Sequence, residues 1–279
     1  MPEPSCLVSA PGSAYALRST NGTFVFHPGT QVAQWEGVEV RLGFSPQIID
    51  RQPYVHRLDL IKTVLPLLAG GALRCTSSPP VIVLDPGHGG QDSGARSTLS
   101  PSWEKQFTLD WARRLQLLLA TNGCQVYLTR TDDREIPLSN RVAFAEECKA
   151  DLFLSLHFNS AGKDLDQAGL ETYCLTPAGM PSALTRGYGD DPQRSFPNNA
   201  FDAQNFQLAF RVHRNLLQVN GHHDRGVRRA RFLGVLRNQQ RPAILIEGGY
   251  LSNKREALLI SEPAYRQKLA EAVARGILQ

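Results

Sequence analysis

Three polar side chains that can bind metals or transfer protons follow apolar runs of the kind that form buried strands. His88 comes after VIVLD in the glycine-rich loop PGHGGQDSGA, His157 follows DLFLSL, and Glu247 follows AILI. A fourth such side chain, Glu104, stands near the start of an amphipathic segment. In open α/β sheets the carboxyl ends of strands meet at a crevice that holds ligands. We therefore expect these four side chains to converge.

Each of these residues also has an ordinary structural interpretation. His88 is in the position of an exposed turn residue, His157 in that of a core histidine bonded to backbone, and Glu104 in that of a helix cap and dipole partner. Glu247 is different, because an ionised carboxylate after four apolar residues costs several kcal/mol unless it is paired or ligating. The recurrence of all four at one end of one sheet favours a shared site.

Two imidazoles and one carboxylate are the ligand set of a catalytic zinc ion that keeps a fourth position open for water. The second carboxylate then suits a general base. Other chemistries lack their signatures, because HExxH and GxSxG are absent and the glycine-rich loop has no GK[ST] ending. The residue types thus predict metal-assisted hydrolysis.

The elements that must position this site alternate between apolar strands and amphipathic helices after residue 80. This order predicts an α/β fold with a mostly parallel sheet flanked by helices on both faces. The expected strands cover residues 81–85, 125–130, 151–158, 170–175, 232–237 and 243–247. The expected helices cover residues 103–121, 140–149, 203–219, 254–260 and 263–278.

The chain changes character near residue 75. Before it, short alternating runs are separated by turn signals such as Asn21-Gly22 and Pro28-Gly29, which predicts a small β-rich domain over residues 1–75. The stretch GGALRCTSSPP has linker composition, so we expect the catalytic domain to cover residues 76–279. Residues 176–205, rich in Pro, Gly, Asp and Asn, predict a surface insertion that either lines a substrate groove or covers the metal.

Composition excludes several classes of function. The formal net charge is +4 with no basic stripe interleaved with aromatics, so nucleic acid is not an expected partner. The five cysteines are scattered without a CxxC pair, which argues against a disulfide framework or a zinc ribbon. We expect no membrane span, because charged residues and a proline interrupt the longest apolar stretch. From MPEPSCLVSAPG, which lacks a basic start and an apolar run, we expect no signal peptide in this sequence.

With these motifs in order, the chain resembles the zinc-dependent N-acetylmuramoyl-L-alanine amidases (amidase 3 family), which cleave bacterial peptidoglycan. The matching segments are LDPGHGGQDSGA, the Glu of WEKQF, TRTDDREIPLSNR, SLHFNS and RPAILIEGGYLSN. The likeness covers roughly residues 80–278 and keeps the order of every motif. Tyr250 stands where the family commonly has Phe, and no ligand position is altered.

The resemblance implies that His88, Glu104 and His157 bind Zn²⁺ and that Glu247 is the catalytic carboxylate. It implies hydrolysis of the amide between N-acetylmuramic acid and L-alanine of the stem peptide by zinc-activated water. Peptidoglycan would be the substrate and the location periplasmic or extracellular, inferred from that substrate. A protein activator is a possible partner that the sequence leaves open.

The N-terminal part, with NGTFVFHPGT and KTVLPLL, faintly resembles the copper-amine-oxidase-like modules that accompany secreted wall enzymes. This implies a non-catalytic accessory domain without a metal. Near the site, Asp85 is expected to orient His88 or cap a turn, and Asn159 to bind substrate or cap its loop. Arg130, Asp133 and Arg141 are expected to form a structural charge network.

Two competing functions stay open at this point. One is another zinc hydrolase on the same scaffold, such as a peptidase that cuts within the stem peptide. The other is a non-catalytic wall-binding protein that keeps the shape, although such a protein has no need of Glu247.

Overall fold

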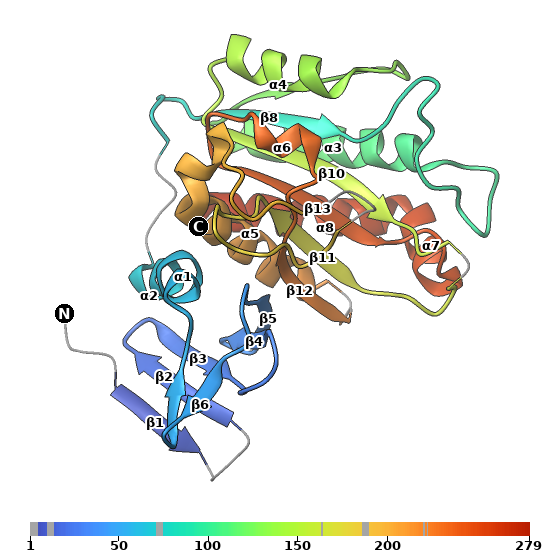
Figure 1. Ribbon diagram of the computed structural model, residues 1–279. Helices are drawn as coiled ribbons and strands as arrows, with labels where there is room; N and C mark the ends of the chain where they lie inside the picture. Colours follow the sequence, from blue (N-terminus) through green and yellow to red (C-terminus); the bar gives the residue numbers. More distant parts are fainter. Residues whose placement is uncertain are drawn as a thin grey trace.

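A computed structural model describes residues 5–9, 14–70, 75–162, 164–185, 190–219, 221 and 223–279. One sheet of 11 strands runs through the described residues in the order β1-β2-β3-β4-β5-β12-β11-β13-β10-β8-β9 (Figure 1). Its strands are β1 (Ser5–Ser9), β2 (Ala14–Ser19), β3 (Gly22–Phe26), β4 (Val32–Trp35), β5 (Val38–Arg41), β8 (Val81–Pro86), β9 (Gln125–Leu128), β10 (Leu152–Asn159), β11 (Leu170–Cys174), β12 (Asp224–Arg229) and β13 (Ala243–Tyr250). A separate hairpin pairs β6 (Gln47–Ile49) with β7 (Gln52–Tyr54).

Helices cover both faces of this sheet. Alternate residues of a strand point to opposite faces, and on β8 Ile82 and Leu84 join one apolar cluster while Val81 and Val83 join another. The first cluster includes side chains of α3 (Glu104–Thr121), α5 (Asp202–Leu217) and α8 (Pro263–Leu278). The second includes side chains of α4 (Leu138–Glu147) and α6 (Gly234–Arg237). The remaining helices are α1 (Arg57–Asp59), η1 (Leu60–Val64), α2 (Leu65–Ala69), η2 (Pro197–Phe201) and α7 (Lys254–Ser261).

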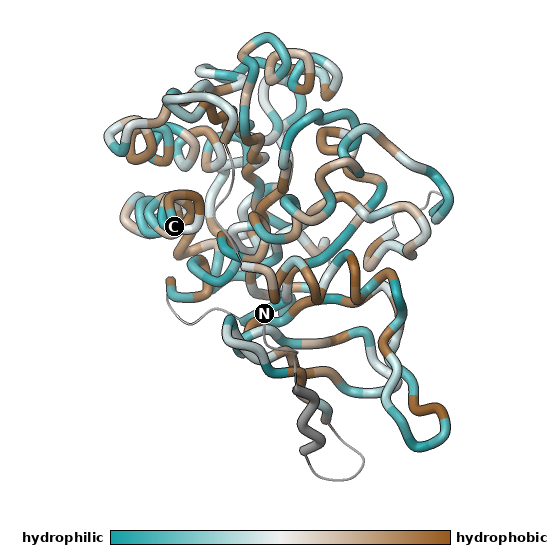
Figure 2. The backbone as a smooth tube through the Cα atoms, turned by 90° about the vertical axis from the view of Figure 1, so that its left-hand side faces the viewer, coloured by the Kyte–Doolittle hydropathy of each residue, from teal (hydrophilic) through white to brown (hydrophobic). Residues whose placement is uncertain are grey.

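This two-sided core confirms the predicted α/β architecture. Brown, apolar stretches of the tube run through the interior in Figure 2, and teal stretches are frequent in the outer loops. Within the described residues, the helices are too short or too polar to cross a membrane.

The strand directions bring the predicted site residues to one edge of the sheet. β8, β10 and β13 lie side by side and run parallel, so their carboxyl ends meet. β11 runs antiparallel to β13, which brings its amino end to the same edge. The sheet therefore brings together site residues that lie far apart in the chain.

The N-terminal strands continue the sheet of the catalytic part. The predicted hairpins form β2 to β5, and β5 meets β12 at the pair Val40 and Val227. Side chains reinforce the junction, because Asp224 Oδ2 of β12 accepts a hydrogen bond from the backbone N–H of Glu39 in β5 at 2.7 Å. Arg229 donates to the carbonyl of Lys62 at 2.6 Å. The division into domains at residue 75 and the accessory module stay predictions.

The predicted strand over 232–237 was wrong. The strand in this region is β12, over the charged sequence DRGVRR, whereas Gly234–Arg237 form the short helix α6. Val235 and Leu236 of this helix are buried in the second apolar cluster. A short apolar run fits a buried helical turn as well as a strand. The strand β12 was missed because its sequence is charged, and its arginines Arg225 and Arg228 form ion pairs with Glu171 in the folded protein.

Candidate metal centre

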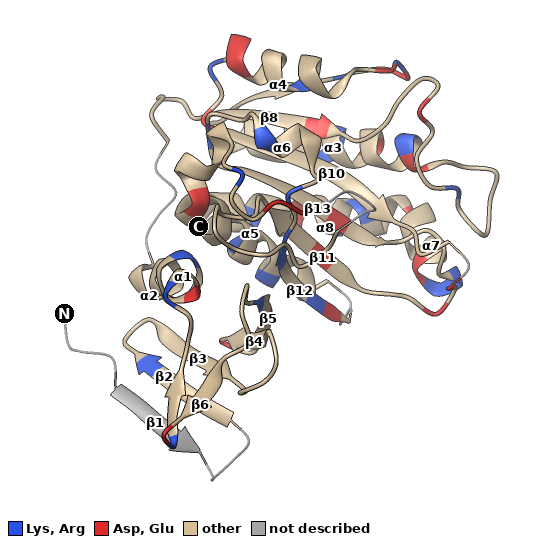
Figure 3. Ribbon diagram, viewed as in Figure 1, with Lys and Arg blue, Asp and Glu red and all other residues tan. Residues whose placement is uncertain are grey.

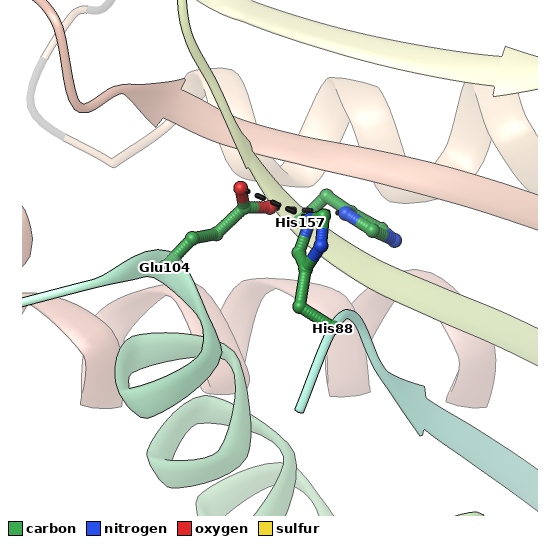
Figure 4. A group of neighbouring side chains, drawn as sticks. All are labelled: His88, Glu104 and His157. Atoms are coloured by element: carbon green, nitrogen blue, oxygen red, sulfur yellow. Dashed lines mark hydrogen bonds and ion pairs between the residues drawn. The ribbon is translucent and has the colours of Figure 1, made fainter. Parts of the chain in front are cut away.

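His88, Glu104 and His157 gather at the carboxyl edge of the sheet, as predicted. Figure 4 shows them coming from the loop after β8, the first residue of α3 and the end of β10. His88 Nε2 lies 3.1 Å from Glu104 Oε2, and His157 Nδ1 lies 3.0 Å from Glu104 Oε1. One nitrogen or oxygen of each residue lies within 4.8 Å of the others. This spacing is compact enough for the three groups to share one cation.

The glycine-rich loop holds His88 in a backbone conformation that residues other than glycine rarely adopt. Its φ of 62° lies in the left-handed region, and Asp92 Oδ1 contacts its Nδ1 at 2.8 Å. A Cβ on Gly87 would lie 2.3 Å from Cε1 of His157, and one on Gly94 would lie 2.6 Å from Glu104 Oε2. Glycine is needed at these two positions because the side chains of His157 and Glu104 fill the space.

Glu104 is held as a buried carboxylate. It is 3% exposed and accepts hydrogen bonds from the backbone N–H groups of Ala95 (2.9 Å) and Phe158 (3.0 Å). Burial alone would raise its pKa, but hydrogen bonds and charge interactions with His157 and His88 hold the pKa well below its usual range. Its place at the start of α3 adds the favourable helix dipole. Glu104 is therefore ionised and ready to bind a cation.

The pKa of His88 is shifted in the opposite direction to that of Glu104. Burial lowers its pKa, but contacts with Glu104 and Asp92 outweigh burial and raise the pKa above its usual value. These carboxylates favour positive charge at this point. A metal ion would supply that charge in place of the proton.

A buried ion pair supports the His88 loop from behind. Asp85 is 1% exposed and accepts from Arg141 Nη1 at 2.6 Å, Thr129 Oγ1 at 2.6 Å and Ser155 Oγ at 2.7 Å. Arg141 also donates to the carbonyl oxygen of His88 at 2.8 Å. Asp85 thus acts on His88 through Arg141, and Asp92 contacts the imidazole.

The predicted charge network is divided into separate contacts. Arg130 donates to the carbonyls of Pro86 and Gly87 at the end of β8. Asp133 instead pairs with Lys105 at 2.7 Å and accepts a hydrogen bond from the backbone N–H of Gly90 at 2.8 Å. Both contacts fix the glycine loop to its surroundings.

Glu247 stands beside the three grouped residues. It is the register partner of His157 across β10 and β13, and it lines the same hollow of about 430 Å³ as His88, Glu104 and His157. Its Oε2 is buried. The position suits a base that faces the same space as the cation, and its catalytic role stays a prediction.

Sequence reasoning missed a charged cluster beyond Glu247. Glu171 is the register partner of Glu247 on β11, and Arg225 and Arg228 both pair with it. Asn159, for which substrate binding or loop capping was expected, donates to Glu171 at 3.0 Å and also accepts from the N–H of Ser160. From the predicted insertion, Leu184 lines the hollow beside this cluster. Residues 186–189 of the insertion lie outside the described part.

With this geometry established, comparisons with known proteins decide the family. The sequence pattern of the N-acetylmuramoyl-L-alanine amidase family (amidase 3) matches residues 82–279 of this chain. The chain belongs to this amidase family. The match includes all four predicted site residues, and the resemblance read from the motifs is confirmed.

Known amidases are similar to this chain in sequence, and a solved structure is similar to it in fold. It is 30% identical over 224 residues to N-acetylmuramoyl-L-alanine amidase AmiA of Salmonella typhimurium, covering 73% of this chain and 76% of that protein. It is 33% identical over 220 residues to AmiC of Escherichia coli, covering 71% of this chain but only 52% of that relative. The solved structure of AmiC2 of Nostoc punctiforme matches with a TM-score of 0.59 and 34% identity, over 72% of this chain and 97% of that one.

Proposed function

We propose that this amidase hydrolyses the amide between N-acetylmuramic acid and L-alanine of the peptidoglycan stem peptide, with zinc as its metal. The observation that carries the proposal is the convergence of two imidazoles and one carboxylate within 4.8 Å of one another. Family membership supports the amidase reaction and the cell wall as its target. This substrate favours a periplasmic or extracellular location.

The donor set fits zinc better than a harder cation. Imidazole nitrogen is a preferred ligand of zinc, whereas magnesium and calcium favour carboxylate, carbonyl and water oxygen. His88, Glu104 and His157 would hold the ion, and three protein ligands leave a position for water or substrate. When bound, zinc lowers the pKa of a coordinated water and polarises a carbonyl.

Glu247 supplies the proton transfers in this proposal. Its carboxylate accepts a proton from the water that attacks the lactyl carbonyl, and later gives that proton to the departing amine of L-alanine. Glu104 stays ionised throughout because its backbone hydrogen bonds and two imidazoles stabilise the charge. The rigid loop around His88 keeps its imidazole in place.

Hydrolysis of a defined muropeptide tests the reaction. The purified protein is stripped with a chelator and then incubated with zinc and a muramoyl pentapeptide of known structure. We expect free pentapeptide with an amino-terminal L-alanine and an intact muramic acid, and no products without metal. Mass spectrometry identifies the bond that is cut.

Two other outcomes would replace the proposal. Cleavage within the stem peptide would make the protein a peptidase on the same scaffold. Zinc bound at full occupancy without hydrolysis of any bond would favour either a wall-binding protein or an amidase that requires a protein activator. The need for a protein activator stays a prediction. The assay tests it, because hydrolysis by the purified protein alone would show that no activator is required.

A further inference from the structure

A second hollow adjoins the metal centre on the far side of Glu247. It measures about 380 Å³ and is lined by Glu171, Arg225 and Arg228, among others. It shares one wall with the hollow at the metal ligands, formed by six residues that line both: Asn159, Ser160, Phe232, Leu233, Leu245 and Glu247. The two hollows are therefore adjacent, with Glu247 at the boundary between them.

The ion-pair cluster in the second hollow joins two arginines to one carboxylate, and Asp164 and Glu247 also line the hollow. Arg225 Nε and Arg228 Nη1 both donate to the same oxygen of Glu171, at 2.6 Å and 2.8 Å. Two guanidinium groups thus share one carboxylate. Figure 3 shows Lys and Arg on β12, the strand that carries both arginines.

Glu171 has little capacity left for a further donor. It is 2% exposed, and its second oxygen accepts from Tyr173 Oη at 2.6 Å and Asn159 Nδ2 at 3.0 Å. Tyr250 Oη donates to the first oxygen at 3.3 Å. Glu171 therefore fixes the arginines in place without neutralising both of them.

The arginines keep donors for a ligand. Their side chains are 24% and 14% exposed for Arg225 and Arg228. Each guanidinium has five N–H donors, and Glu171 accepts from one nitrogen of each arginine. The Arg225 guanidinium lies over the ring of Tyr250, 5.4 Å from its centroid, and that of Arg228 over Tyr173 at 5.9 Å. The rings limit how far the guanidinium planes can turn.

We propose that Arg225 and Arg228 form a subsite for a carboxylate of the stem peptide. The inference rests on the proposed function, because that function places the scissile amide at the metal. The leaving L-alanine then lies beside Glu247, and the rest of the peptide continues into the second hollow. The next residue of the stem is D-glutamate linked through its side chain, so its α-carboxylate is free unless it has been amidated.

The chemistry of the subsite favours a carboxylate over its amide. A guanidinium group matches the geometry of a carboxylate with two parallel donors, and these charge-assisted bonds are about twice as strong as neutral ones. Asp164 lines the exposed mouth of the hollow and Glu247 its shared wall. These two acidic groups weaken the positive potential of the arginines in this hollow.

A pair of substrates that differ in one group tests the subsite. The zinc-loaded protein is given two muramoyl tripeptides, one with D-glutamate and one with D-isoglutamine at the second position. Wild type, Arg225→Gln and Arg214→Gln are compared, where Arg214 is an exposed arginine on α5 that does not line the hollow. Arg225→Gln is chosen because Arg225 is the more exposed member of the pair.

We expect wild type and Arg214→Gln to cleave the carboxylate substrate with a kcat/KM about tenfold or more above that of the amide. Arg225→Gln should lose most of this preference by losing activity on the carboxylate substrate alone. Equal activity of wild type on both substrates would overturn the subsite, as would an equal loss on both in Arg225→Gln. Absence of cleavage of either substrate by wild type would count against amidase activity of the protein acting alone and would overturn the subsite with it.

Discussion

His157 and Glu247 are register partners on the neighbouring parallel strands β10 and β13. Paired residues on adjacent strands project to the same face of the sheet, so a predicted metal ligand and the predicted base stand side by side. The two residues are 90 positions apart in the chain (247 − 157). The pairing of two buried strands therefore places the predicted metal ligand beside the predicted proton acceptor.

Replacing Glu247 by Gln should separate metal binding from catalysis. The amide cannot accept the proton of the attacking water, so we expect kcat on a defined muropeptide to fall by about 10²- to 10⁴-fold. Zinc content should stay that of wild type, because Glu247 is not among the three grouped ligands. Glu147→Gln, an exposed change on α4, is the control. Turnover at the wild-type rate would remove Glu247 from the mechanism.

Adding one methyl group at Gly87 should disturb the metal centre. A Cβ there lies 2.3 Å from Cε1 of His157, so the imidazole must move. We expect Gly87→Ala to weaken zinc affinity by about 10- to 100-fold, the range seen when the support of a metal ligand is lost. Competition with a chromogenic chelator measures the affinity.

Gly234→Ala is the matched control for this change. Its Cβ would meet Cδ1 of Leu138 at 2.9 Å, the end of a flexible and exposed side chain. This variant should bind zinc as wild type does. Equal zinc affinity of Gly87→Ala and wild type would show that the close approach to His157 has no effect on the ligand.

Removing Arg141 should destabilise the fold near His88. Arg141→Met leaves the buried carboxylate of Asp85 without its cation, and breaking such a pair costs about 3–5 kcal/mol. The double variant Asp85→Asn with Arg141→Met should recover part of this loss, because it removes the buried charge. Urea denaturation gives the free energy of unfolding. A single variant as stable as wild type would contradict the role assigned to the pair.

Asp151 should make stability depend on pH in the acid range. Burial raises its pKa, but hydrogen bonds from Ser77, Thr76 and the backbone of Val81 outweigh burial and lower the pKa to about 2. Because the folded pKa lies below that of the unfolded chain, this contribution is complete above about pH 4. It disappears as the pH falls toward 2.

Comparison with Asp151→Asn isolates this contribution. The variant should be less stable than wild type at pH 5, and the difference between the two should shrink as the pH falls from 4 toward 2. Urea midpoints at several pH values measure the difference. A difference that stays constant over this range would show that Asp151 is not held ionised by the segment before β8.

The sequence predicted the core of the fold because its strongest signals come from burial. VIVLD and AILI are buried on both faces of the sheet, and such runs identify central parallel strands. The convergence of His88 and His157 followed from the same reasoning, since parallel strands present their carboxyl ends together. The position of Glu104 at the first turn of α3 matched both its structural and its ligand interpretation.

The charged cluster around Glu171 escaped prediction for a physical reason. An ion pair between distant segments leaves no spacing pattern in the chain, and a charged strand such as DRGVRR looks like an exposed loop. Arg225 and Arg228 are accommodated only because β11 brings Glu171 beside β12. Similarly, Asp92 contacts His88 through a loop conformation that the residue types alone do not specify.

X-ray absorption at the zinc edge tests the metal centre most directly. For the zinc-loaded protein we predict nitrogen and oxygen ligands at about 2.0–2.1 Å, with the outer-shell signature of two imidazoles and no sulfur. In His157→Ala the imidazole contribution should fall from two to one. Sulfur ligation, or a spectrum that is unchanged in His157→Ala, would contradict the proposal that His88, Glu104 and His157 share one zinc ion.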